Sequence, residues 1–576
     1  VLAKASQAPM FDLYAYTLEP GQSAELTVNC PEPVRISVIA PNGVTNEVAT
    51  IPAGEARYTA RFGATGTNGT YQVRVASTSG KVSTGCFFVR PPWSWYLKQA
   101  RTEALRLTPR ADLSNDCCET WYHLLGFYLV QKYFPDPELD SKGDQILDKI
   151  MKRLFREKDG KMYSVIYPER VQNCTAMISI LVDRYECTGD VASLETAVKL
   201  AEYLMSRQHA KGYYGGGGMH PYTAVLYPAK SLMELMDVER TLGRTNATWK
   251  ARYDRHYDSV RLAMDDLATW GRNMKTEGGA TYEDGAVTCA SLQLAAFALM
   301  QDDPATRKKY MEPARQYLED HKCLTRLNDT DGRSRSTTLR FWEAWGEVRM
   351  SPGQMMLSPH GWSAWRMYAM HYLYLLTGEE FYLRENMNAL GSGMQLLHWP
   401  SGRLHNSFVT DPHLLIAELK PDPVKPAGVP EPTYLGEHYL DTMGDWYGRN
   451  TKGTNYLDRV EWGWSGDGTP YEIIKAMEEI ALTSAYVVER ADGSLVGYNC
   501  RVTRKLARVG LFQWVASLAG YKCRVTKNDD TVEVTPSEPV VKRVHLNLKK
   551  PANVRVVFLS VPPVERRVSG MEWIKL

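Results

Sequence analysis

Alternating apolar and polar positions mark the first 92 residues. Residues 26–30, 36–38, 58–62, 71–75 and 86–88 each place an apolar side chain at every second position, and turn residues separate these runs. A period of two is typical of a strand with one buried face, and short strands between frequent turns are typical of a sandwich. The pattern therefore predicts an Ig-like antiparallel β-sandwich over residues 1–92.

The period changes to three and four after Pro91 and Pro92, and it stays helical to about residue 418. Helices meet at short junctions such as Cys187 to Asp190 and Leu376 to Glu379, in which a glycine ends one helix and an acidic residue begins the next. The recurrence of this junction, about six times, predicts an (α/α)6 toroid over residues 93–418. We expect outer helices to begin near 94, 141, 190, 246, 304 and 379, and inner helices near 115, 170, 221, 284, 356 and 404.

The end of the chain returns to the period of two. Residues 484–576 predict a second antiparallel β-sandwich. Residues 419–483 are rich in Trp, Gly and Pro without clear periodicity, and we expect them to pack on the toroid. The predicted fold class is thus multidomain α+β, with a central (α/α)6 toroid flanked by two antiparallel sandwiches.

Two cysteines lie on the inferred inner face of the first sandwich. Cys30 and Cys86 fall on strands expected to be second and last, so a disulfide between them is predicted, with two buried thiols as the alternative. A disulfide would place the protein outside the cytosol. Cys500 and Cys523 form a second candidate pair in the last domain.

Composition and charge narrow the function classes. The 576 residues carry a net charge of +2 without a long basic run, which argues against nucleic acid as a partner. No stretch of 18 apolar residues exists, so no membrane span is predicted. The chain starts at Val1 without a secretion signal, so it is either cytosolic or the product of signal-peptide removal. Tyr and Trp, at 33 and 15, outnumber Phe at 13, and such amphipathic rings suit a cleft that stacks sugars.

The N-termini of the inner helices point to one mouth of a toroid, so residues in and before these helices are the candidate site. Histidines and tyrosines there can move protons near neutral pH, and arginines can bind a carboxylate. The candidate catalytic residues are His220, His360, His405, Tyr214 and Tyr222. The candidate substrate-binding residues are Glu119, Trp121, Asn173, Tyr213, Tyr282, Arg333, Arg335, Arg340, Trp342, Trp362, Trp399 and Asn406.

Two features of these segments bear on ligands. Gly215 to Gly218 are four consecutive glycines, which we expect to border the substrate because they let the backbone approach closely. Asn328 to Gly332 resembles part of a calcium loop but lacks the acidic ends of an EF-hand. No histidine pair has zinc spacing, so no cofactor is firmly implied and only calcium is left open.

The reaction class follows from the balance of these residues. Glycoside hydrolysis normally needs an opposed carboxylate pair. The carboxylates available form no distinctive motif; they are Glu119, Glu283, Asp284, Glu343 and Asp467. β-Elimination from a uronic acid needs a neutral base and a group that neutralises the carboxylate, which His, Tyr, Arg and Asn supply. The sequence favours a lyase, with a six-hairpin glycoside hydrolase and a non-catalytic glycan-binding protein as alternatives.

The order of β-domain, helical toroid and terminal sandwich resembles polysaccharide lyases and related six-hairpin glycosidases. It is most similar to the L-rhamnose-α-1,4-D-glucuronate lyases of polysaccharide lyase family 27. The resemblance implies a secreted or periplasmic enzyme, with its signal peptide removed, that removes rhamnose from glucuronate on arabinogalactan side chains. It also implies an exo-acting mode and an acidic oligosaccharide or polysaccharide as the partner.

Overall fold

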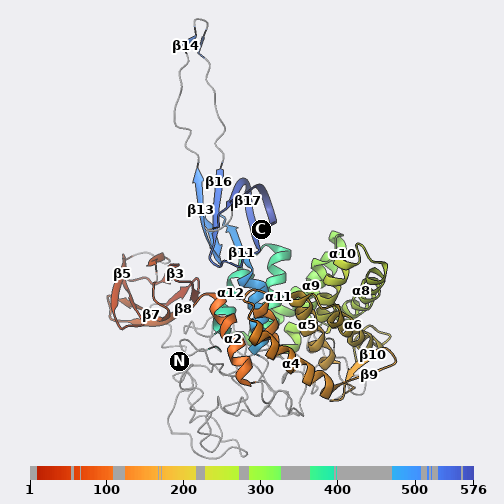
Figure 1. Cartoon of the computed structure of the whole chain (residues 1–576). Helices are drawn as coiled ribbons and strands as arrows, with labels where there is room; N and C mark the ends of the chain where they lie inside the picture. Colours follow the sequence, from red (N-terminus) through yellow and green to blue (C-terminus); the bar gives the residue numbers. More distant parts are fainter. Residues whose placement is uncertain are drawn as a thin grey trace, which may run out of the picture. The chain divides into compact units, whose positions relative to one another are not determined.

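The computed structural model covers two compact units, residues Val1–Ala476 and Met477–Leu576, and each unit is presented by itself. It describes most of the strands and helices that the sequence predicts (Figure 1). The described residues are 10–53, 58–64, 66–107, 124–166, 168–169, 171–215, 223, 228–271, 284–325, 363–394, 397, 470–506, 516–517, 520–521, 530–558 and 562–576.

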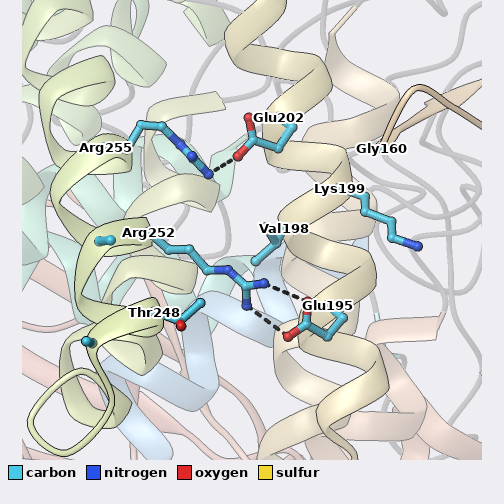
Figure 2. A pocket seen from close by; sticks show the side chains of 10 residues that line it. Gly160, Glu195, Val198, Lys199, Glu202, Thr248, Arg252 and Arg255 are labelled. Atoms are coloured by element: carbon cyan, nitrogen blue, oxygen red, sulfur yellow. Dashed lines mark hydrogen bonds and ion pairs between the residues drawn. The ribbon is translucent and has the colours of Figure 1, made fainter.

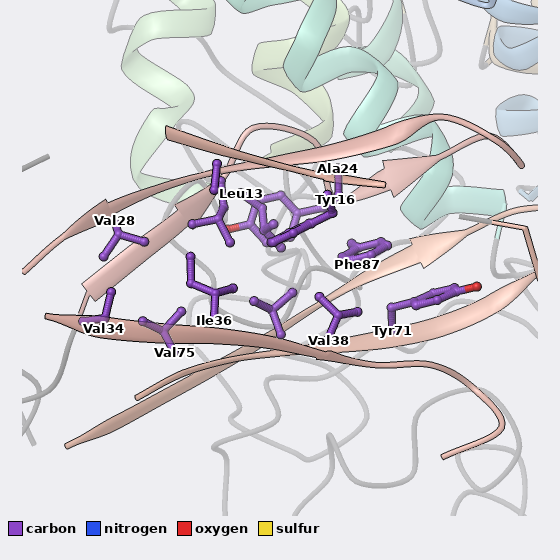
Figure 3. Packing of buried hydrophobic residues seen from close by; sticks show 14 of the residues in the cluster. Leu13, Tyr16, Ala24, Val28, Val34, Ile36, Val38, Tyr71, Val75 and Phe87 are labelled. Carbon is purple, nitrogen blue, oxygen red and sulfur yellow. The ribbon is translucent and has the colours of Figure 1, made fainter. Parts of the chain in front are cut away.

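Two sheets form the N-terminal part of the first unit. One sheet has the order β1-β3-β6 and the other the order β2-β8-β7-β4-β5. Apolar side chains from both sheets make one buried cluster, which includes Val28, Ile36 and Phe87 (Figure 3). The strands are β1 Met10–Leu13, β2 Thr17–Leu18, β3 Ser23–Asn29, β4 Val34–Ile39, β5 Thr45–Ile51, β6 Tyr58–Ala64, β7 Gly69–Ser77 and β8 Val82–Val89.

The predicted Cys30–Cys86 disulfide is wrong, because both residues are thiols in the structure. Cys30 belongs to the buried cluster between the sheets, and so do Phe87 and Val89 of β8. Since side chains alternate along a strand, Cys86 lies on the opposite face of β8 from Phe87. The run Cys86 to Val89 is buried on both faces, so its apolar character did not reveal which residues face inward. Without this disulfide, the two cysteines no longer indicate an oxidising compartment.

Helices make up most of the remaining described residues of the first unit. They begin within a few residues of most predicted positions, and Gly189 and Gly378 end helices with φ of 71°. The helices are α2 Trp93–Leu107, α3 Leu125–Gln131, α4 Pro137–Leu154, α5 Gln172–Thr188, α6 Val191–Ser206, α7 Pro228–Leu242, α8 Ala247–Leu267, α9 Asp284–Leu299, α10 Pro304–Asp320, α11 Ser363–Thr377, α12 Glu380–Met394 and α15 Pro470–Met477. A hairpin of β9 Phe155–Lys158 and β10 Lys161–Ser164 follows α4, and a short 3-10 helix, η7 His321–Leu324, follows α10.

One set of helices forms an inner row. In this row α3 packs on α5, α5 on α7, α7 on α9 and α9 on α11. The alternate helices pack outside it: α2 on α3, α6 on α5, α8 on α7, α10 on α9 and α12 on α11. The inner helix α5 is buried on all sides from Gln172 to Asp183, whereas outer helices such as α4 bury one stripe, which is the expected difference between a core helix and a surface helix.

The short helix α15 joins the two ends of the inner row. A Cβ on Gly126 of α3 would lie 2.8 Å from the Tyr471 ring, and one on Gly393 of α12 would lie 2.9 Å from Ile473. Trp365 of α11 donates a hydrogen bond to Glu472 at 2.6 Å. Among the described residues, α15 therefore lies between α3 and α11, inside the segment expected to be irregular, and the predicted start near residue 404 lies outside the described residues.

The second unit is built on one mixed sheet with the order β12-β11-β17-β16-β13, and β18 pairs with β17. The predicted all-antiparallel pairing is wrong in two places, because β17 runs parallel to both β11 and β16. Cys500 is a thiol in β13, and Cys523 lies outside the described residues. The elements are a π-helix, η12 Glu478–Leu482, and the strands β11 Ser484–Glu489, β12 Leu495–Tyr498, β13 Cys500–Leu506, β14 Ala516–Ser517, β15 Gly520–Tyr521, β16 Asp530–Pro536, β17 Arg543–Val556 and β18 Val564–Lys575.

Acidification is expected to destabilise this unit through His545. Burial, and then the nearby Arg543 guanidinium, lower the pKa of His545 to about 4. Because the folded state favours the neutral ring, this stabilisation is present above the unfolded pKa of about 6.5 and is lost as pH falls to about 4, by up to about 3 kcal/mol. Thermal midpoints of the wild type and His545→Gln, compared between pH 7 and pH 4, check this. An identical pH dependence in both proteins would contradict it.

Candidate active site

Most of the predicted site residues precede inner helices in the chain. Three of them, Asn173, Tyr213 and Tyr214, are described. The others lie outside the described residues: His220, His360, His405, Tyr222, Glu119, Trp121, Tyr282, Arg333, Arg335, Arg340, Trp342, Trp362, Trp399 and Asn406. Gly216 to Gly218 and the segment that resembles a calcium loop, 328–332, also lie there.

The described candidates make packing contacts. Tyr214 is fully buried, its hydroxyl is 2.9 Å from the Ser259 hydroxyl, and burial raises its pKa. Asn173 is also fully buried, and its amide donates to the Ile166 carbonyl at 2.8 Å, which ties α5 to the chain after β10. The structure thus gives both residues a role in packing.

Tyr213 lies at the turn between α6 and α7, where it is half-buried and stacks on His209. The ring centroids are 4.5 Å apart and the planes differ by 8°. Gly212 fixes this turn, because its φ is 109° and a Cβ would lie 2.1 Å from the Leu262 carbonyl oxygen. Outer helices end and inner helices begin on the same side of the row, so Tyr213 belongs to the side where the inner helices start.

A chain of buried charges links four inner helices, and sequence reasoning missed it. We call it the charge ladder: Lys132, Asp183, Lys475, Glu234 and Lys230, in order of contact. Lys132 lies 2.7 Å and Lys475 2.8 Å from the two Asp183 oxygens. Lys475 also lies 3.2 Å from Glu234, which pairs with Lys230. Lys132 also pairs with the half-exposed Glu186, so three carboxylates balance the three cations.

Both carboxylates of the ladder are held ionised. Burial by itself would raise the pKa of Asp183, but Lys132 and Lys475 lower it below its ordinary value. Burial acts on Glu234 in the same way, and Lys230 with Lys475 lowers its pKa to about 2. The Ser179 hydroxyl adds a hydrogen bond to Glu234 at 2.6 Å. Neither group therefore holds a proton at neutral pH.

One end of the ladder lies beside aromatic rings. Lys230 is in the first turn of α7, and its amine lies 4.2 Å from the centroid of the Tyr368 ring on α11. Trp365, one turn earlier on α11, donates to Glu472 in the first turn of α15. The starts of these three inner helices thus bring a lysine, a carboxylate and two aromatic rings together, and all four side chains are buried.

The groove between the outer helices α6 and α8 is a poorer candidate. It measures 660 Å³, and Figure 2 shows Arg252 and Arg255 facing Glu195 and Glu202. Lys199 also lines the groove, but it points away from these pairs and lies 2.7 Å from Glu157. Arg252 pairs with Glu195 through two contacts of 2.9 and 2.8 Å, and Arg255 pairs with Glu202. These pairs satisfy one another, so the groove offers no unbalanced charge for an acidic ligand.

Two searches of the described residues gave negative results. No group of three or more His, Cys, Asp or Glu side chains in this part of the chain is placed to hold a metal ion. None of its helices is long and apolar enough to cross a membrane.

Comparison with solved structures places this arrangement among known folds. One match is the polysaccharide lyase BACCELL_00875, with a TM-score of 0.53 and 16% identity over 69% of this chain. The chain has the fold of a polysaccharide lyase. It spans 60% of the length of that protein. The resemblance to polysaccharide lyases stated from the sequence is confirmed at the level of the fold.

Other solved structures match less well. The β-arabinofuranosidase BT3674 has a TM-score of 0.41 and 12% identity, over 83% of this chain and 77% of its own. A family 76 glycoside hydrolase from a bovine Bacteroides thetaiotaomicron strain has a TM-score of 0.35 and 10% identity, over 82% of this chain and 100% of its own. No protein-family model and no curated protein matches the sequence.

Proposed function

We propose that the chain is a polysaccharide lyase that cleaves a glycosidic bond to a uronic acid by β-elimination. The observation that carries the proposal is the shared fold with a polysaccharide lyase. The proposed site is the end of the helical row where the inner helices begin. His220, His360, His405 and Tyr222 would move the protons, and the arginines at 333, 335 and 340 would bind the uronate carboxylate.

The charge ladder weighs against the hydrolase alternative. A glycosidase needs one carboxyl group that holds a proton at working pH, which a raised pKa provides. Asp183 and Glu234 come close together through Lys475, yet the pKa of each is lowered. This pair cannot supply a general acid at neutral pH, so a hydrolase would have to draw its acid from other carboxylates.

The finer parts of the proposal concern organisation and substrate. The helices from α2 to α12, with α15, would form an (α/α)6 toroid as the catalytic domain, flanked by sandwich domains at residues 1–92 and 484–576. Rhamnose-capped glucuronate on arabinogalactan side chains is the proposed substrate, attacked from the end of the chain. Such a substrate lies outside the cytoplasm, and the protein would act there.

Incubation with rhamnose-capped glucuronate oligosaccharides is expected to release rhamnose together with a 4,5-unsaturated uronate. Elimination leaves a double bond conjugated to the carboxylate, so ultraviolet absorbance rises as rhamnose appears. In mass spectrometry, the uronate product is lighter by one water than the product of hydrolysis. The control is the same oligosaccharide with its carboxylate reduced to an alcohol. It lacks the group that makes the neighbouring C–H acidic, so it should not undergo elimination. Rhamnose release without absorbance would instead indicate hydrolysis.

A further inference from the structure

The second unit has an excess of positive charge that is not apparent from the small net charge of the whole chain. Residues 477–576 contain 16 Lys and Arg against 10 Asp and Glu, a net charge of +6. The complete chain carries +2, so residues 1–476 carry −4. An excess of one sign on a single unit raises the local concentration of oppositely charged polymers.

Part of this charge lies on one face of the sheet. Even-numbered residues of β16 and of the second half of β17, such as Val532, Val534 and Val554, enter the apolar core of the unit. Their odd-numbered neighbours therefore face away from that core. β13, β16, β17 and β18 pair side by side over this stretch (Figure 1). We call the outward side chains the polar face: Arg501, Thr503, Lys505, Thr531, Glu533, Thr535, Asn553, Arg555, Glu565 and Arg567.

The register fixes how these groups are spaced. Thr503 is opposite Glu533, which is opposite Arg555. Lys505, Thr531, Asn553 and Arg567 form the next row across the four strands. Because neighbouring strands lie about 4.8 Å apart, each row spans roughly 14 Å, the scale of a short oligosaccharide.

Charge on the polar face is only partly balanced. Lys505 pairs with Glu533 at 2.7 Å, and Arg555 lies 3.5 Å from the 70% exposed Glu565, a pair weakened by solvent. Arg501 and Arg567 have no carboxylate partner among the described residues, although Arg567 donates to Asn553. Two exposed guanidiniums thus remain at diagonal corners of a surface rich in hydroxyl and amide groups.

The geometry points to the polar face as a binding site for a strand of acidic polysaccharide. Guanidiniums bind carboxylates bidentately, and threonine and asparagine side chains offer hydrogen bonds to sugar hydroxyls. The choice of a uronate polymer over other polyanions rests on the proposed function. Such a site would hold the enzyme on a long polymer between cleavage events.

Affinity electrophoresis of the full chain tests this, in gels containing uronate-bearing arabinogalactan or the same polymer with its carboxyls reduced. Wild-type protein should be retarded by the first polymer only. The double variant Arg501→Ala/Arg567→Ala should lose about tenfold in affinity, whereas Arg35→Ala/Arg61→Ala, with side chains 69% and 66% exposed in the first unit, should bind as the wild type does. Both variants lose two positive charges, so net charge is matched.

Three results would overturn the inference: unchanged retardation of the Arg501/Arg567 variant, equal loss in the control variant, or equal retardation of the wild type by the carboxyl-reduced polymer. If the Arg501/Arg567 variant lost its affinity for duplex DNA to the same extent as its affinity for the polysaccharide, the inference would also be overturned. The polar face would then bind polyanions in general. Turnover of a short oligosaccharide should be unchanged in both variants. Failure of the proposed function is distinguishable, because it would abolish unsaturated product in the wild type while leaving polymer binding to be measured.

Discussion

Replacing Lys475 by methionine is expected to lower the free energy of unfolding of the first unit by about 3–5 kcal/mol. Lys475 is the one cation that touches both carboxylates of the charge ladder, at 2.8 Å from Asp183 and 3.2 Å from Glu234. Methionine keeps the apolar stem but removes the charge. Two buried carboxylates would then share only the lysines at the ends of the ladder.

The matched control is Lys142→Met, because Lys142 also lies 2.8 Å from its partner, Glu138, but on an exposed helix surface. That change should cost less than about 1 kcal/mol. Denaturant unfolding of both variants at pH 7 measures the difference. If both variants lowered the free energy of unfolding by the same small amount, the charge ladder would be solvated in solution, contrary to its burial in the structure.

Replacing the proposed catalytic histidine by alanine is expected to lower kcat by 10²–10⁴-fold, or about 3–5 kcal/mol of activation free energy. His220, His360 and His405 are each tested, since each precedes or enters a predicted inner helix. At least one variant should lose turnover while its melting temperature stays near that of the wild type. Near-native rates in all three would contradict the assignment.

Two tyrosines provide an internal control for this experiment. Tyr214→Phe removes a hydroxyl that lies 2.9 Å from Ser259 in the interior, so it should cost about 1 kcal/mol of stability and leave kcat unchanged. Tyr222→Phe should lower kcat if its hydroxyl transfers a proton. The opposite pattern, with only Tyr214 needed for turnover, would mean that the loop before α7 rearranges when substrate binds.

Sequence periodicity placed the outer helices because each buries one apolar stripe, and the capped junctions between helices placed most of the inner ones. Asp190 and Asp303 cap α6 and α10, and these starts were placed within one residue. Periodicity failed for α15, whose eight residues are too short to establish a repeat. It also could not assign a face to Cys86, because the neighbouring residues are buried on both sides of the strand.

The charge ladder was missed because lysines and carboxylates in helices usually face solvent. A signal was present, however: Asp183 interrupts the apolar run of α5, and Lys230 and Glu234 are four residues apart in an otherwise apolar part of α7. Charged residues on the buried stripe of a helix are costly unless paired, so such positions predict partners on other helices. The partner Lys475, 241 residues after Glu234, could not be identified without the fold.

Closure of the inner row by α15 has a consequence for synthesis of the chain. Tyr471 hydrogen-bonds the backbone of Ala100, 371 residues earlier. At about 5–20 residues per second, a ribosome needs roughly 20–70 s to make the intervening segment. Throughout that time the first helices have no neighbour at one apolar edge, and the buried carboxylates have not met Lys475. The nascent chain would therefore depend on chaperones for longer than a domain assembled from local hairpins alone.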